Sequence, residues 1–317
     1  MKHFLSIQDV PDLNDLVGKA LRYKSDPYID KTAGHNKRIG LLFFNPSMRT
    51  RLSTQIAARN LGLDSIVLNV GQEGWTLEFG DDTIMNGTTV EHIRDAAPVL
   101  GKYFDLLGVR TFPALQNKEE DYSENYLNQF VRHAGVPIVS LESATLHPLQ
   151  SLADIITLHE AMPRGRKPKI VLTWAPHIKA LPQCVANSFS QWVNAWNEAD
   201  FYITHPPGFA LDESFSKGAT ITTDQDQALE GADFVYVKTW SSVANYGKIP
   251  EPLPNWMLTA KKVGGTNRAK VMHCLPVRRN VELASEILDG PHSLVTEQAA
   301  NRVWAAQAVL RELLRNG

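Results

Sequence analysis

The chain alternates between short apolar runs and amphipathic stretches along most of its 317 residues, and this alternation limits the folds open to it. The apolar runs are continuous, which is typical of strands covered on both faces in a parallel sheet. Strands are expected at 38–44, 65–70, 105–112 and 137–143 in a first half, and at 169–175, 200–206, 233–240 and 269–276 in a second. Amphipathic helices are expected between them at 90–102, 122–134, 147–161 and 183–197, and a last helix follows the final strand.

This order of elements predicts an α/β protein with two doubly wound parallel-sheet domains. The segment "PRGRKPK" (163–169) resembles a linker, so we expect the domains to cover 1–150 and 151–299. Ligands of such folds bind at the carboxyl ends of the strands. The residues that follow the strands are therefore the candidates for a functional site.

Composition excludes several classes of protein. A net charge of −2 argues against a nucleic-acid or membrane-surface partner, so any positive site must be local. The two cysteines, Cys184 and Cys274, are too few for a disulfide scaffold and fit a reducing cytoplasm. The N-terminus lacks a signal-peptide pattern, and no apolar stretch is long enough to span a membrane.

The stretch "NPSMRTR" (45–51) marks a switch from strand to helix. Ser47 is suited to cap the helix, whose first-turn N–H groups attract an anion. Arg49 offers a bidentate fork for phosphate oxygens, and Thr50 adds a hydroxyl donor. No Walker motif and no G-x-G-x-x-G occurs, which favours a small phosphate over a nucleotide. A capped helix with solvated arginines is the alternative interpretation.

Further motifs follow in a fixed order: "HPLQ" (147–150), "HCLP" (273–276), and a late arginine, Arg302, in the terminal helix. Together with S-x-R-T-R, they give the chain a resemblance, over nearly its whole length, to the aspartate/ornithine carbamoyltransferase family. The resemblance implies that the first domain binds carbamoyl phosphate and the second the amine, with a terminal helix (300–317) packed on the first domain. It also implies a homotrimer with shared active sites and a role in arginine biosynthesis.

The implied reaction is attack of a neutral amine on the carbonyl of carbamoyl phosphate, which needs oxyanion donors and positive charge but no metal or cofactor. By resemblance, Thr50, Arg110 and His147 polarise the carbonyl. The carbamoyl phosphate site is completed by Ser47, Met48, Arg49, Trp75, Gln150, Cys274, Leu275 and Arg302. In the family branch that uses N-acylornithines, a tryptophan in the loop of Trp75 reaches the neighbouring subunit's site.

The amine is indicated by "KTWSSVA" (238–244), where ordinary ornithine carbamoyltransferases carry D-x-W-x-S-M-G. Their aspartate pairs with the α-ammonium of ornithine, which Lys238 would repel. Acylation of that nitrogen removes its charge and leaves a carboxylate that suits Lys238. "TWAPHIKALPQ" (173–183) also resembles the N-acylornithine branch, which implies that His177 bonds the acyl or carboxylate group and that Glu142 orients or deprotonates the δ-amine. That branch threads a backbone knot, which we expect around 175–185 and 238–252.

Two acyl groups remain open. The acetyl branch carries a glutamate at the position of Val90, and this glutamate would repel a succinyl carboxylate. Val90 has no charge, and Lys179 is able to pair with an added carboxylate, so we expect N-succinylornithine. A register shift that brings Glu91 into the pocket would favour N-acetylornithine instead.

Two other classes of function compete. Cys274 with His273 or His147 would suit a Cys–His hydrolase, although neighbouring strand residues point to opposite faces. A non-catalytic phosphate- or nucleotide-binding Rossmann-like module is the other.

Overall fold

The computed structural model describes residues 1–163 and 165–316, which form two compact units. The first unit contains Met1–Pro113, Glu119–Leu149 and the chain from Arg302 onward, and the second contains Ala114–Lys118 and Gln150–Asn301. The boundary between the units therefore falls inside helix α6 (Pro148–Ala161) and inside helix α12 (Val295–Asn316). In the described part of the chain, no helix is both long and apolar enough to cross a membrane.

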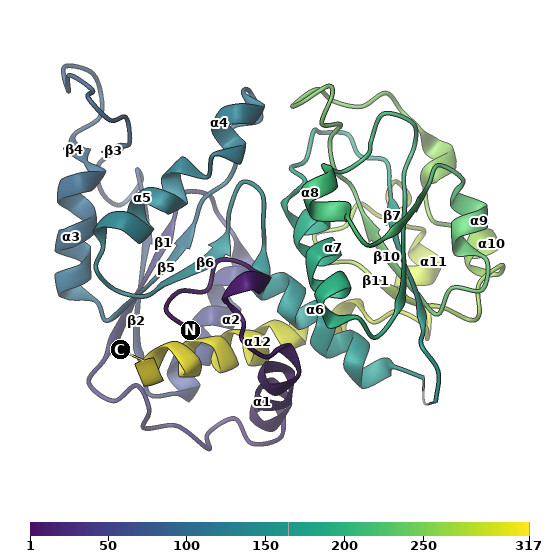
Figure 1. Ribbon diagram of the computed structural model, residues 1–317, viewed down its shortest axis with the longest axis horizontal. Coiled ribbons are helices and arrows are strands. Elements are labelled where there is room, and N and C mark those ends of the chain that lie inside the picture. Colours follow the sequence, from purple (N-terminus) through teal and green to yellow (C-terminus); the bar gives the residue numbers. More distant parts are fainter. Residues whose placement is uncertain (164, 317) are drawn as a thin grey trace. The chain divides into compact units, whose positions relative to one another are not determined.

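A parallel sheet with the strand order β2-β1-β5-β6 forms the centre of the first unit. Its strands are β1 (Arg38–Phe43), β2 (Asp64–Asn69), β5 (Leu106–Arg110) and β6 (Ile138–Glu142). The helices of this part of the chain are η1 (Ile7–Asp9), α1 (Leu13–Ser25), α2 (Met48–Asn60), α3 (Ile93–Tyr103), α4 (Lys118–Tyr122) and α5 (Asn125–His133). Figure 1 shows the terminal helix α12 beside α1, where Lys19 forms an ion pair with Glu312.

Apolar side chains bury this sheet, as the continuous runs predict. Leu107 and Val109 of β5 pack with Ile93 of α3 and Phe130 of α5 in one buried cluster. Strand β1 is likewise buried from Ile39 onward. Because β1 and β5 are covered on both faces, their carboxyl ends are the places where polar side chains can gather.

The second unit has a parallel sheet with the order β11-β10-β7-β8-β9. Its strands are β7 (Lys169–Trp174), β8 (Asp200–Thr204), β9 (Thr220–Thr222), β10 (Phe234–Lys238) and β11 (Lys270–Met272). Its further helices are α7 (Cys184–Trp196), α8 (Glu213–Ser216), α9 (Gln225–Leu229), η2 (Pro254–Trp256), α10 (Ala260–Val263) and α11 (Ser285–Leu288).

Strand β10 shows how this sheet is covered on both faces. Tyr236 packs against Phe189 of α7, whereas its neighbours Val235 and Val237 belong to a cluster that includes residues of α9 and α11. Successive side chains of a strand point to opposite faces, so one apolar run fills two layers. Figure 1 shows α7 on one side of this sheet and α9 and α10 on the other.

The structure corrects two helix predictions. The helix expected at 122–134 is divided into α4 and α5 at Glu124, which adopts a left-handed conformation with φ 52°. The Glu124 carboxylate accepts hydrogen bonds from Ser143 Oγ (2.6 Å) and the Thr145 backbone N–H (2.7 Å), and these contacts hold the break. The helix expected from residue 90 begins at Ile93, because Glu91 and His92 form β4 and pair with β3 (Leu77–Glu78).

The segments expected to form a knot contact each other within the second unit. The Ser241 backbone N–H donates to the Leu181 carbonyl at 2.8 Å, and Thr239 Oγ1 donates to the Ala175 carbonyl at 2.8 Å. Gln183 Nε2 donates to the Ser241 carbonyl at 2.7 Å. The knot itself stays a prediction.

Candidate active site

Helix α2 begins directly after strand β1 and its short connection, as the sequence indicates. Ser47 occupies the N-cap position with extended backbone (φ −154°), but its side chain makes no capping hydrogen bond, so the expected capping bond is absent. Met48 is exposed, Arg49 is half-buried and Thr50 is buried. The first turn of α2 therefore combines backbone N–H groups with the side chains of Arg49 and Thr50, which suits an anion.

Thr50 is fixed by an arginine from the other end of the chain. Arg302 Nη2 donates a hydrogen bond of 2.6 Å to Thr50 Oγ1, and both side chains are buried. A hydroxyl has one hydrogen and accepts through its lone pairs. Because Arg302 takes a lone pair, the Thr50 hydrogen can be directed to another acceptor.

Arg110 ends strand β5 and is held on several sides. Its Nη1 donates to the carbonyls of Asn45 (3.0 Å) and Pro46 (3.3 Å), and its Nη2 contacts Glu142 Oε2 at 2.5 Å. The Arg110 Nε lies buried with no hydrogen-bond partner in the described structure. Glu142, which the resemblance implies at the amine, thus forms a buried ion pair with Arg110 in the first unit.

His147 lies next to this pair, with its Nε2 atom 3.8 Å from Glu142 Oε2. Burial lowers the pKa of His147 to about 3; Glu142 opposes this effect, and the charges of Arg302, Arg110 and Arg49 add to it. The imidazole is therefore neutral at physiological pH and can act as a hydrogen-bond donor to a carbonyl oxygen without carrying a charge.

Trp75 and Val90 lie on a projecting segment, residues 71–92, which we call the arm. Trp75 is 57% exposed and Val90 is 62% exposed, so neither side chain belongs to the core. Trp75 Nε1 donates to Glu91 Oε2 at 2.6 Å. The β3–β4 pair anchors the arm, which extends beyond the amino-terminal end of α3 in Figure 1.

In the second unit, Gln150 belongs to a buried polar network that extends to His273, the residue before Cys274. Gln150 Nε2 and Gln298 Nε2 both donate to Asp154 Oδ1, at 2.8 and 2.7 Å. Gln298 Oε1 in turn accepts from the His273 backbone N–H at 2.9 Å. Because Asp154 takes the amide N–H of Gln150, the amide oxygen of Gln150 faces away from it and can accept a hydrogen bond.

Three of the expected amine residues, His177, Lys179 and Lys238, follow or end strands of the second unit's sheet. Lys238 ends β10 and is buried, while Lys179 is exposed. His177 Nε2 accepts from Arg278 Nε at 3.1 Å, and its Nδ1 contacts the Lys179 backbone. Sequence reasoning assigned no role to Arg278, because it stands outside the HCLP motif. The neighbouring Arg279 forms a bidentate ion pair with Asp289, with its two terminal nitrogens at 2.7 and 2.8 Å from the carboxylate oxygens. We therefore assign Arg279 a structural contact and no role in the site.

After β11, Leu275 adopts a left-handed conformation with φ 57°. For a residue other than glycine this costs roughly 1–3 kcal/mol and is often found at functional sites. His273 cannot serve Cys274 as a base, because its Nδ1 accepts from the Leu275 N–H (2.9 Å) and its Nε2 contacts Glu282 (3.4 Å). This pairing argues against a hydrolase built on His273 and Cys274.

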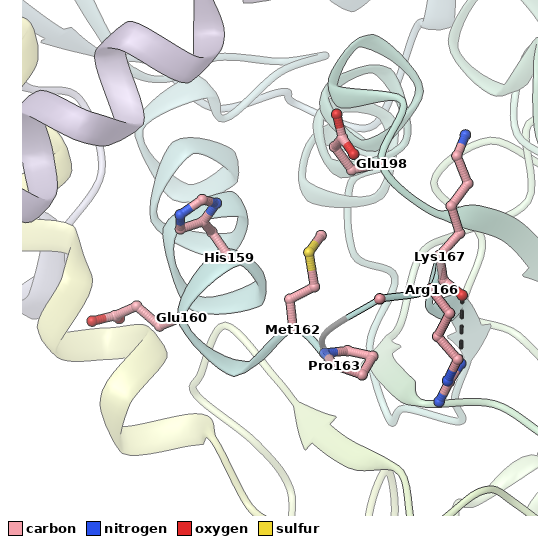
Figure 2. Close-up of a pocket in the computed structure, with 8 residues that line it drawn as sticks. His159, Glu160, Met162, Pro163, Arg166, Lys167 and Glu198 are labelled. Carbon is pink, nitrogen blue, oxygen red and sulfur yellow. Dashed lines mark hydrogen bonds between the residues drawn. The ribbon is translucent and has the colours of Figure 1, made fainter.

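A separate hollow of the second unit holds none of the expected residues. It is lined by His159, Glu160, Met162, Pro163, Gly165, Arg166, Lys167 and Glu198 (Figure 2). Arg166 is paired with Asp233, and Lys167 Nζ donates to the Asn197 carbonyl at 3.1 Å. Since these cations are engaged in structural contacts, the hollow is a poor candidate for an anion site.

Comparison with known proteins finds family models in both halves of the chain. The profile "Aspartate/ornithine carbamoyltransferase, carbamoyl-P binding domain" matches residues 2–160, and "Aspartate/ornithine carbamoyltransferase, Asp/Orn binding domain" matches residues 184–313. N-succinylornithine carbamoyltransferase of Bacteroides fragilis is 46% identical over 100% of this chain and 99% of its own length. N-acetylornithine carbamoyltransferase of Xanthomonas campestris pv. campestris is 34% identical over 99% and 98%.

A solved structure shows the same fold. A mutant of N-acetyl-L-ornithine transcarbamylase, complexed with carbamyl phosphate and N-succinyl-L-norvaline, superposes with a TM-score of 0.91 and 35% identity, covering 99% of this chain and all of the other. Matching profiles in both halves, full-length relatives and a shared fold place this chain in the aspartate/ornithine carbamoyltransferase family.

Proposed function

We propose that this chain transfers the carbamoyl group of carbamoyl phosphate to the δ-amine of N-succinyl-L-ornithine, giving N-succinyl-L-citrulline and phosphate. The observation that carries the proposal is the buried Lys238 at the carboxyl end of β10. A buried cation at this place suits a substrate whose α-nitrogen is uncharged and whose α-carboxylate is free.

Carbamoyl phosphate would be held by the first unit. Its phosphate fits the N-terminus of α2 with Arg49, where N–H groups and a guanidinium converge. Its carbonyl oxygen fits the donors Thr50, Arg110 and the neutral His147. These donors suit the oxyanion that forms when the amine attacks, and expulsion of phosphate then completes the transfer.

The acylornithine would be held by the second unit. Lys238 and Arg278 offer positive charge to its α-carboxylate, and His177 is already ordered by its contact with Arg278. The amide oxygen of Gln150 and the backbone around Cys274 suit the carbamoyl NH₂ group. A role of Glu142 on the δ-amine stays a prediction, since its nearest partner is Arg110.

The succinyl group is favoured by Val90 on the arm. N-acetyl-L-ornithine transcarbamylase in which one glutamate is replaced by alanine, proline or serine has been crystallised with N-succinyl-L-norvaline. The family resemblance assigns Val90 to the position of a glutamate in the acetyl branch. Glu91, whose entry into the pocket would favour the acetyl substrate, is bound to Trp75. N-acetylornithine is the second candidate.

A citrulline-type product assay with ornithine, N-acetylornithine and N-succinylornithine side by side tests the proposal. We expect the highest kcat/KM with N-succinylornithine, and the highest value with free ornithine would refute the argument from Lys238. Val90→Glu should shift preference toward N-acetylornithine, because its carboxylate repels the succinyl group. Val99→Glu, at an exposed valine of α3, is the matched control and should leave selectivity unchanged.

We also infer a homotrimer with shared active sites. Met48, Leu52 and Ile56 follow one another at intervals of four residues on α2 and are all exposed. Such a stripe of apolar side chains on one helix face is typical of a surface that binds a protein partner. The exposed Trp75 fits a neighbour's carbamoyl phosphate site. Sedimentation of the purified protein tests the assembly, and a monomer at micromolar concentration would contradict it.

The remaining inferences concern location and pathway. Neither Cys184 nor Cys274 forms a disulfide, which supports a reducing cytoplasm. An N-acylcitrulline product suits a place in arginine biosynthesis. Restored growth of a carbamoyltransferase-deficient arginine auxotroph, supplied with N-succinylornithine and a deacylating enzyme, would test that role.

A further inference from the structure

Glu282 is a buried carboxylate outside the residues that the sequence singled out. Its side chain is 1% exposed and lies between the end of β11 and the start of α11. Oε1 lies 3.0 Å from Thr239 Oγ1, which also contacts the Ala175 carbonyl, and 3.4 Å from His273 Nε2. Oε2 accepts from the Arg278 backbone N–H at 2.7 Å. The carboxylate thus joins three segments that are distant in the sequence.

Each of these segments carries a residue of the proposed acylornithine site. Thr239 follows Lys238 at the end of β10, and His273 precedes Cys274 at the end of β11. Arg278 is itself a member of the site and donates through its Nε to His177 at 3.1 Å. Glu282 therefore contacts Thr239, His273 and the Arg278 backbone directly, and these are members or direct neighbours of the site residues.

The hydrogen-bond directions favour an ionised carboxylate. The Leu275 N–H donates to His273 Nδ1, so the proton of a neutral His273 is on Nε2 and faces Glu282. The Arg278 N–H is a donor too, whereas the single hydrogen of Thr239 Oγ1 is shared between Glu282 and the Ala175 carbonyl. Burial raises the pKa of Glu282, but the bond from His273, the charge of Lys238 and the Arg278 N–H outweigh this and lower it to about 2.

The Glu282 carboxylate also interacts electrostatically with Lys238. The lysine is 8% exposed, and a buried cation is costly unless a negative charge lies near. Glu282 is a carboxylate of the same unit on which the Lys238 charge acts, so it offsets the cost of burying that cation.

We propose that Glu282 is a positioning residue of the amine-substrate site, which holds Lys238, Cys274 and Arg278 at their relative places without touching the substrate. This inference rests on the proposed function. Glu282 would influence the selection of the substrate through the residues that bind the acylornithine, without binding it directly.

Glu282→Gln tests the proposal. Glutamine has the same size but presents an NH₂ group in place of one oxygen, so at least one of the three donors meets another donor. We expect KM for N-succinylornithine to rise on the order of 10-fold to 100-fold, the usual effect of a lost charge-assisted hydrogen bond. The dissociation constant of carbamoyl phosphate, measured by calorimetry, should change much less, because its phosphate and carbonyl oxygen are proposed to bind the first unit and only its NH₂ group meets the backbone around Cys274. Glu286→Gln, at an exposed glutamate four residues on, is the matched control.

Thr239→Val provides a second variant, since it removes one donor and leaves Glu282 with its other two partners. It should raise KM for N-succinylornithine in the same direction but less, and the double variant should be less than additive. Unchanged KM in Thr239→Val and Glu282→Gln, or an equal loss of affinity for both substrates with a lower Tm, would overturn the proposal. A wild-type enzyme that fails with N-succinylornithine but turns over free ornithine would instead refute the proposed function.

Discussion

The neutral state of the buried His147 predicts how the free energy of unfolding depends on pH. The side chain is 4% exposed, and burial together with nearby arginines lowers its pKa to about 3. In the unfolded chain, the pKa of histidine is about 6.5. Between these values the unfolded state binds more protons than the folded state, so the free energy of unfolding falls as the pH falls through this window.

The size of this effect follows from the two pKa values. Lowering the pH from 7 to 5 protonates His147 in the unfolded chain but not in the folded one, which costs about 2 kcal/mol of stability. The figure hardly changes if the folded pKa is about one unit higher, because pH 5 stays above it. His147→Asn removes the titrating group, so this variant should lose about 2 kcal/mol less than the wild type over the same interval.

Urea unfolding at pH 5 and pH 7 measures the difference. The comparison is made between the two pH values within each protein, so a general loss of packing in the variant cancels. His159→Asn, at an exposed histidine of α6, is the control and should follow the wild type. Equal pH dependence in wild type and His147→Asn, or an NMR titration of His147 centred near pH 6.5, would refute the reasoning.

Three further predictions concern turnover. Arg110→Met should lower kcat on the order of 10²-fold, as for a lost oxyanion donor; product formation at saturating substrate measures it, and near-normal kcat would contradict the assigned role. Cys274→Ala should leave part of the activity in the same assay, whereas loss of all turnover would revive the hydrolase interpretation. Lys238→Met should raise KM for N-succinylornithine on the order of tenfold with little change for carbamoyl phosphate, and steady-state kinetics with each substrate varied in turn would reveal an unselective effect if the reasoning is wrong.

The sheets could be predicted from the sequence because their strands are short, apolar and bounded by turn residues. β1, β5, β7 and β10 lie within a few residues of their expected limits. The break at Glu124 could not be predicted, because it depends on hydrogen bonds to Ser143 and Thr145, which lie close only in the folded unit. Local pattern describes what a segment prefers, whereas a distant partner decides where it bends.

The same distinction applies to the site. The motifs around Ser47, His147 and Cys274 are contiguous and therefore visible in the sequence. The ion pair between Arg110 and Glu142 was missed, although both residues end neighbouring strands and are partners in the β5–β6 register. The order of strands in the sheet would have revealed it. Glu282 has no motif around it, since its partners come from separate strand ends.

The exposed Trp75 on the arm has a consequence for mixtures of damaged subunits. If the Trp75 ring completes the site of an adjacent copy, a Trp75→Ala chain keeps an intact first turn of α2. An Arg49→Ala chain keeps an intact arm. Each variant alone would be nearly inactive. Mixed and reassembled at equal amounts, random partnering in a ring would rebuild about a quarter of the catalytic centres from one intact half of each chain. Two nearly inactive protein preparations would then become active when they are mixed.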